Sequence, residues 1–526
     1  MKQMKQFLSM AALAIVGTIM SCTSSDEISA GSQPETKTIT QTITLSLEDD
    51  DASTRGFDIK TGKKRFYDSD TICVFYRQEP GYVSWRAFSQ PPCQVSADGQ
   101  KATFTVALEN PKENSPIRIV YRSSMMGSPA TNEEVDFTND NLTLAVSSLQ
   151  QNQNGRGERV FGQLATFDVA TYDGTLNGTS LPENVALRNR MAILALTVKN
   201  GGTDITNTIK DLKINDGFRT YDVQTKEFHL DTIYVAMFPV DMTQTLTIIA
   251  EDLSSNHYMK VVTGKELKRS NIYPVNLTMT KLTPKVLADG NYTASNNDII
   301  SGHSNNCTIT IPDGATVVLN GVNSGTGQLS NNTYIKCQGS ANIIFTGENH
   351  LNAPESSNHP AIHVPQNKSL SISGTGLLTV KSKGGAGIGA GHSDLPCGDI
   401  NILGGDINAS STTDAGIGAG GAGSTCGKIN IIGGNIEAAA DNGASAAIGG
   451  GSVSGSTKIT ITSGVNSLTV KGGDNRFICN SSGGVVGDVT IDGKTSFTFT
   501  TSDMQFDHFK SVRKTEDENS WTLTHK

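Results

Sequence analysis

The hexapeptide Ala386-Gly387-Ile388-Gly389-Ala390-Gly391 recurs as Ala415-Gly416-Ile417-Gly418-Ala419-Gly420 and, in a weaker form, as Ala446-Ala447-Ile448-Gly449-Gly450-Gly451. The segments between these copies repeat as well, because 397–405 aligns with 426–434, and 457–461 forms a third copy. Repeats of about 30 residues with short I-x-I segments and corner glycines are typical of a parallel β-solenoid, in which each coil buries its apolar face against the next.

The repeat continues upstream, since Ala361-Ile362-His363-Val364 and Tyr334-Ile335 fit one and two coils earlier. The stretch 384–470 contains no Phe, Tyr or Trp. Stacked ladders of Ile, Leu and Val explain how such a segment forms a core, and glycine permits its tight corners. We predict a parallel β-helix over 283–496, with about six or seven coils and a length on the order of 30 Å. The range 497–526, which carries Phe506, Phe509 and Trp521, is predicted to cap it.

The chain upstream of the repeats shows short alternating segments separated by turn residues. This pattern predicts strands with one buried face and two β-sandwich domains, at 37–165 and 166–282, in an all-β protein. Thr283-Pro284-Lys285 is predicted to be a linker. The predicted strands are 39–47, 72–76, 102–106, 117–121, 191–198, 233–238 and 246–250.

The N-terminus predicts secretion. Lys2 and Lys5 precede an apolar run from Phe7 to Met20, which is too short to span a bilayer because that requires ~20 apolar residues. Ile19-Met20-Ser21-Cys22 resembles a bacterial lipobox, so we expect a signal peptide at 1–21 and lipidation of Cys22. The alternative is ordinary secretion with cleavage near Ser21. The polar range 22–36 is predicted to be a flexible tether.

Several segments of the first half together resemble the fimbrillin-like family of surface lipoproteins, over residues 37 to 282. The resemblance implies two β-sandwich domains, an outer-membrane protein anchored at the cell surface by its lipid, and polymerisation with other fimbrial subunits. In that family some members donate a strand after cleavage behind an arginine, for which Arg55 is the candidate; an ordinary exposed arginine is the alternative. The segments are Thr54-Arg55, 70–75, 187–194, 264–267 and 271–277.

Charge and cysteine spacing limit the other functions. The net charge is -9 and the basic residues are scattered, which argues against nucleic-acid binding. Cys397 and Cys426 occupy the same place in consecutive coils, ~4.8 Å apart, so they form either a disulfide or a stacked thiol pair. The other candidate disulfides are Cys73 with Cys93 and Cys307 with Cys337. Since no CxxC motif or Cys/His cluster occurs, we predict no metal and no cofactor.

Catalysis and binding remain to be compared. A polysaccharide lyase or hydrolase on a β-helix would need paired carboxylates or an acidic cluster beside a base. Asp394, Asp399 and His392 form the best such cluster. We predict no enzyme and expect adhesion or glycan binding instead, because the solenoid also resembles the glycine-rich repeats of bacterial adhesins. A passive spacer is the third hypothesis. The residues expected to contact a glycan or another surface ligand are Asp394, Asp399, Asn408 and Asp414.

Overall fold

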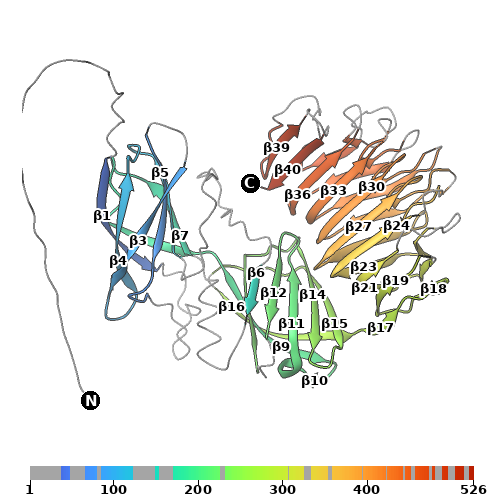
Figure 1. Cartoon of the computed structure of the whole chain (residues 1–526), viewed down its shortest axis with the longest axis horizontal. Helices are drawn as coiled ribbons and strands as arrows, with labels where there is room; N and C mark the ends of the chain where they lie inside the picture. Colours follow the sequence, from blue (N-terminus) through green and yellow to red (C-terminus); the bar gives the residue numbers. More distant parts are fainter. Residues whose placement is uncertain are drawn as a thin grey trace, which may run out of the picture.

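The computed structural model shows an all-β protein (Figure 1). Among the described residues there is no α-helix, and a single 3-10 turn lies at Thr206–Thr208. The predictions for Cys22, Arg55 and Asp394 lie outside the described residues. The ranges described are 37–47, 66–79, 84–121, 149–152, 170–225, 231–269, 271–305, 307–324, 333–353, 358–393, 395–421, 423–441, 445–451, 456–472, 477–479, 488–495, 504–514 and 520–525.

The first domain is a closed barrel in the order β1-β4-β3-β2-β5-β7-β8. β1 closes it, because this strand pairs antiparallel with β4 and parallel with β8. Ile43 and Leu45 of β1 are fully buried in its core. The strands are β1 (Thr38–Leu47), β2 (Ile72–Arg77), β3 (Ser84–Val95), β4 (Lys101–Glu109), β5 (Pro116–Tyr121), β7 (Ala170–Thr175) and β8 (Asn184–Asn189).

Two predictions for this domain are corrected. The boundary at residue 165 is too early, because β7 and β8 complete the first barrel. Cys73 and Cys93 are free thiols, since the register pairs Cys73 with Phe88 while the Cys93 thiol donates to the Tyr67 carbonyl. Burial raises the pKa of Cys73 to about 12, which keeps this thiol protonated and unreactive at neutral pH.

The second domain is a nine-stranded sheet folded into two layers around one core. β16 joins the layers, because it pairs with β9 in one and β15 in the other. The elements are β6 (Leu149–Asn152), β9 (Ala192–Asn200), β10 (Thr203–Asp204), β11 (Ile209–Asn215), β12 (Thr220–Gln224), β13 (Ile233–Met237), β14 (Thr245–Asp252), β15 (His257–Thr263) and β16 (Ile272–Lys281).

The solenoid begins directly after β16. Its strands stack in three parallel series, here called the first, second and third runs. The first run is β17 (Thr283–Val286), β19 (Asp298–His303), β21 (Thr316–Asn323), β23 (Ala341–Thr346), β26 (Ser369–Gly374), β29 (Asp399–Ile402), β32 (Cys426–Ile431), β35 (Ser456–Ile461) and β38 (Val489–Ile491). The second run is β24 (Glu348–Asn352), β27 (Leu377–Ser382), β30 (Asp406–Ser411), β33 (Gly434–Ala440) and β36 (Val465–Lys471). The third run contains eight short strands: β18 (Tyr292–Thr293), β20 (Ile309–Ile311), β22 (Ile335–Cys337), β25 (Ile362–His363), β28 (Ile388–Gly389), β31 (Ile417–Gly418), β34 (Ile448–Gly449) and β37 (Ile478–Cys479).

The predicted stacking is confirmed. Ile388 pairs with Ile417 and Ile417 with Ile448, and all three are fully buried. Gly418 has φ +136°, and a Cβ there would lie 2.4 Å from the carbonyl oxygen of Gly449, so only glycine fits this close approach of coils.

The cysteines of the solenoid have different states. Cys397 and Cys426 form a disulfide with Cα atoms 4.6 Å apart. The proposed pair Cys307 and Cys337 is wrong, because the register places Cys337 beside Ile311 and both thiols are free.

The cap prediction is confirmed for the described residues of its range. β40 (Ser520–His525) pairs antiparallel with β36, and β39 (Phe509–Lys514) pairs with β40. Phe506, Phe509 and Trp521 are buried in the solenoid core. The aromatic side chains therefore cover the last coil, whose apolar interior no further coil would bury.

The solenoid packs along the side of the second domain, as Figure 1 shows. One buried apolar cluster joins them, with Ile249, Met259 and Leu282 from the second domain and Ile299, Val318 and Ile344 from the first run. The predicted linker 283–285 is wrong, because Thr283–Val286 is a strand that pairs with β19. The second domain and the solenoid therefore share a core.

Polar and backbone contacts extend this interface beyond the apolar cluster. The Thr247 hydroxyl lies 3.0 Å from that of Ser373, and the amide of Gly434 donates to the carbonyl of Gly217. Further along, the Phe218 ring meets the His525 ring edge to face, with centroids 5.0 Å apart. The second domain thus contacts the solenoid from its first coils to its cap.

Candidate functional site

The outward side chains of β24, β27, β30, β33, β36 and β40, which are neighbours in one sheet, form a surface here called the polar face. In these strands inward apolar residues alternate with outward polar ones, so each outward position recurs once per coil. Figure 1 shows β24 to β36 side by side along the solenoid. The strand register aligns the middle outward positions into a central row of His350, Thr379, Asn408, Glu437, Thr469 and Thr522.

A second row of outward positions lies nearer the second domain and contains Asp406, Asn435 and Ser467. These side chains form hydrogen bonds with one another. The amide of Asn435 donates to Asp406 Oδ1 at 2.7 Å, and the Ser467 hydroxyl donates to Asn435 Oδ1 at 2.9 Å. Such ladders between coils stabilise the stack. They also leave fewer donors and acceptors for a ligand in this row.

The central row differs. The side chains of His350, Thr379 and Asn408 are partly exposed and make no hydrogen bond within the described part of the chain. Further along, Thr469 and Thr522 lie 3.3 Å apart, oxygen to oxygen. Three consecutive coils therefore offer an imidazole, a hydroxyl and an amide that have no partner among the described residues and are open to solvent or a ligand.

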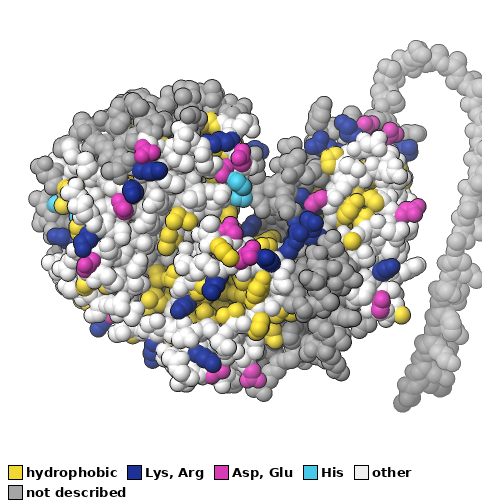
Figure 2. Space-filling view, turned by 180° about the vertical axis from the view of Figure 1, so that it is seen from behind, with side chains coloured by type: hydrophobic (Ala, Val, Ile, Leu, Met, Phe, Trp, Pro, Cys, Tyr) yellow, Lys and Arg dark blue, Asp and Glu magenta, His cyan; other side chains and the backbone are white. Residues whose placement is uncertain are grey.

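The polar face carries charges of both signs. Glu437 Oε1 pairs with Lys471 Nζ at 2.8 Å, with both side chains at least one third exposed. Lys381 offers a further positive charge, and Asp406 a negative one. Figure 2 shows that the opposite side of the molecule also carries charged side chains of both signs, spread among uncharged residues. This surface favours a polar ligand over a highly charged one.

The structure separates the residues predicted to bind a glycan. Asn408 lies in the middle of the central row. Asp399 lies on β29 in the first run, where its Oδ1 accepts from the amide of Lys428 at 2.8 Å. The prediction for Asp414 is corrected, because this residue is fully buried and cannot reach a ligand.

Asp414 has a structural role in the solenoid corner. Its Oδ2 accepts from the Gly385 amide at 2.9 Å and lies 2.8 Å from Nδ1 of His392, which is 35% exposed. Gly385 belongs to the preceding coil, at the position equivalent to Asp414 itself. The carboxylate therefore ties two successive corners together.

The sequence analysis missed Thr379, His350 and Glu437. A signal for them exists, because each lies between two inward apolar or amide positions of a strand, and Thr379, Asn408 and Glu437 recur 29 residues apart.

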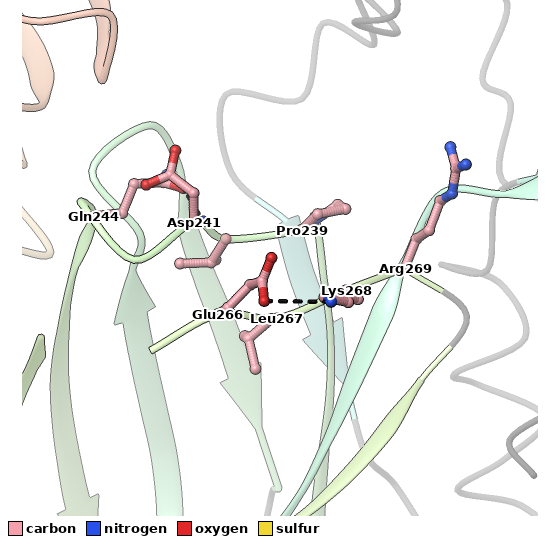
Figure 3. Close-up of a pocket in the computed structure, with 8 residues that line it drawn as sticks. Pro239, Asp241, Gln244, Glu266, Leu267, Lys268 and Arg269 are labelled. Atoms are coloured by element: carbon pink, nitrogen blue, oxygen red, sulfur yellow. Dashed lines mark hydrogen bonds and ion pairs between the residues drawn. The ribbon is translucent and has the colours of Figure 1, made fainter. Parts of the chain in front are cut away.

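A surface groove of about 560 Å³ lies on the second domain (Figure 3). Its walls are the paired segments around Val240 and Leu267. Glu266 and Lys268 form an exposed ion pair at 3.5 Å, while Asp241 Oδ1 accepts from the Thr243 amide at 2.7 Å, as in a turn. The groove is lined by Pro239, Val240, Asp241, Gln244, Glu266, Leu267, Lys268 and Arg269. Its charged groups thus have structural partners or lie in solvent, where catalytic groups are rarely activated.

Two features are absent from the described residues. In that part of the chain no three His, Cys, Asp or Glu side chains come together as a metal site would require. The same residues form no helix with the length and apolarity needed to cross a bilayer.

A carboxyl pair on the second domain predicts an unusual pH dependence. Burial raises the pKa of Asp211 to about 7, with the nearby carboxylates of Asp222 and Glu251 acting in the same direction and Lys213 opposing them. Asp211 Oδ1 and Asp222 Oδ1 are both buried without partners within the described residues. The folded state therefore holds a proton that the unfolded chain loses near pH 3.8.

We expect the free energy of unfolding to fall as pH rises from 4 to 7, because the folded state binds more protons over that range. Asp211→Asn should remove this slope and stabilise the protein at pH 8 by roughly 2 kcal/mol. Urea unfolding at several pH values measures it. Asp204→Asn is the control, since hydrogen bonds from Thr206 lower the pKa of Asp204. An unchanged slope in Asp211→Asn would refute the prediction.

Comparisons with known proteins assign no family to this chain. No family model matches the chain, and no curated protein matches it. A proposed cell adhesion protein from Bacteroides ovatus shares 14% identity at TM-score 0.26, covering 46% of this chain and 95% of its own. A fimbrial assembly protein from Parabacteroides distasonis shares 12% at TM-score 0.25, covering 46% and 92%. The fimbrillin-like resemblance stays a prediction at these values.

Proposed function

We propose that this protein is a lipid-anchored cell-surface adhesin whose solenoid binds a glycan through the polar face. Cys22 carries the anchor on the outer membrane, and the barrel and the second domain hold the solenoid away from it. The observation that supports binding is the central row, where three neighbouring coils present unpaired polar side chains on a rigid sheet. A passive spacer would have no need of such groups.

The polar face suits binding better than catalysis. General acid and base catalysis needs carboxylates or imidazoles held close to one another with shifted proton affinities. In the polar face Glu437 is paired with Lys471, and Asp406 is bonded to Asn435. The pair of His392 and Asp414 comes nearest to that arrangement, but the Asp414 carboxylate is buried.

Substitution of two residues of the central row should weaken glycan binding. We expect the double variant Thr379→Ala, Asn408→Ala of the chain from residue 37 onward to weaken binding at least about tenfold, because two hydrogen bonds of ~1 kcal/mol each are lost. A glycan array with the parent chain identifies the ligand, and titration calorimetry compares the variants.

Asn430→Ala is the matched control, because Asn430 occupies an outward position of the first run and donates to Asn401 at 2.8 Å. It should bind as the parent does. Equal binding by the double variant would place the ligand elsewhere, and no binding by the parent to any glycan would favour the passive spacer.

A fimbrial role is the second candidate, and the position of β1 favours it. β1 is the first described strand, precedes Arg55, and closes the barrel between β4 and β8. Cleavage behind Arg55 would detach this strand from the rest of the barrel. The open seam would then accept an equivalent strand from another subunit.

A further inference from the structure

We propose that the ligand of the polar face is an extended, linear polysaccharide of low charge, lying along the solenoid axis over the central row. This inference rests on the proposed glycan binding and names the shape of the glycan. The inference excludes short branched glycans that are recognised by their terminal sugar, because such recognition needs a closed pocket.

Periodicity is the first argument. The central row has one side chain per coil, in unbroken register from His350 to Thr522. The coils lie ~4.8 Å apart, as in any sheet, so the row is about 24 Å long. An extended chain of pyranose rings advances by a similar distance per sugar, so each ring can meet an equivalent polar group. A short glycan would use only part of such a row.

Shape is the second argument. The outward residues belong to regular, adjacent strands of one sheet, whose register carries the row across successive coils. Such a sheet surface cannot enclose a terminal sugar, which would lose little of its hydration there. A polymer compensates for weak contact per unit by repeating it, since each further unit adds contacts without a new loss of translational freedom.

Chemistry is the third argument. The central row lacks aromatic rings other than the His350 imidazole, so recognition must come from hydrogen bonds to hydroxyl groups. Thr379 and Asn408 each both donate and accept, which suits sugar hydroxyls. The pairing of Glu437 with Lys471 leaves no unbalanced charge at the centre of the row to select a polyanion.

The row has defined ends. Beyond Thr522 the next position is Val512, an exposed apolar side chain of the outermost strand β39. At the other end, beyond His350, the register continues to Asn323 at the end of β21 and then to His303 at the end of β19, and Asn323 already has an interaction partner within the protein. A ligand longer than the row meets an apolar side chain at one end and an already partnered amide at the other, so the affinity should rise little with further chain length.

The test measures affinity against chain length. The chain from residue 37 onward is titrated with β-1,4-linked glucose, xylose and N-acetylglucosamine oligomers of increasing length. For at least one of these series we expect affinity to rise about tenfold between two and five units and to change less than about twofold beyond six. Thr379→Val, which removes one hydroxyl at constant shape, should reduce the affinity of long oligomers about fivefold.

The outcomes separate this inference from the proposed function. Binding of a branched or single-sugar glycan from the array with no dependence on length would overturn the linear polymer and leave glycan binding intact. Absence of binding to every array glycan and every oligomer would overturn both. Length-dependent binding that Thr379→Val does not weaken would place the polymer on another surface and would also overturn the inference.

Discussion

Val318→Asp is expected to separate the second domain from the solenoid and to destabilise the chain by about 3–5 kcal/mol, because an unpaired charge would be buried in an apolar cluster. Val318 is fully buried and packs in the cluster that contains Ile249 and Met259. We expect two unfolding transitions in calorimetry where the parent chain has one for these two units. Hydrogen exchange should become faster in β14 and β15, which line the interface.

Val512→Asp is the matched control, because it introduces the same charge at a valine that is 43% exposed. It should change the stability by less than about 0.5 kcal/mol. If Val318→Asp changed the stability as little as this control does, the second domain and the solenoid would be independent units. The shared core also means that a fragment starting at residue 284 exposes Ile299, Val318 and Ile344 and should aggregate.

Removal of β1 should open the barrel. A chain that begins at residue 56 lacks Ile43 and Leu45 and the hydrogen bonds to β4 and β8. We expect the first domain to lose about 5 kcal/mol or more, which equals the whole stability of many small domains. Calorimetry should show this transition vanish while that of the second domain and solenoid persists.

A peptide of residues 37–47 should restore the lost transition when added in trans, since it supplies the missing strand. The same peptide with Ile43→Ser and Leu45→Ser is the control and should have no effect. A truncated chain that melts like the parent would show that β1 is dispensable, and the fimbrial candidate would lose its structural support.

Local pattern predicted a large part of this fold. Inward Ile388, Ile417 and Ile448 stack as their spacing predicts, and Cys397 meets Cys426 because both hold the same position in successive coils. In a solenoid each coil contacts mainly its neighbours, so sequence spacing translates directly into spatial position. The cap was predictable for the same reason, since Trp521 and Phe509 appear where the repeat ends.

The candidate site was predicted only in part. Asn408 belongs to the central row, whereas Asp399 lies on a different run and Asp414 is buried. Polarity alone does not distinguish a side chain open to a ligand from one that satisfies a corner. Asp414 shows this, because its carboxylate serves Gly385 and His392 of another coil.

By itself the sequence determined the all-β class, the stacking of the solenoid and the place of its aromatic cap, because these depend on residues a fixed number of positions apart. Only the tertiary structure decided that β7 and β8 close the first barrel and that Ile249 of the second domain packs with Val318 of the solenoid. Such contacts join segments without a repeating distance between them. Apolar side chains of any two strands are chemically alike, so their partners follow from the shapes of whole folded layers.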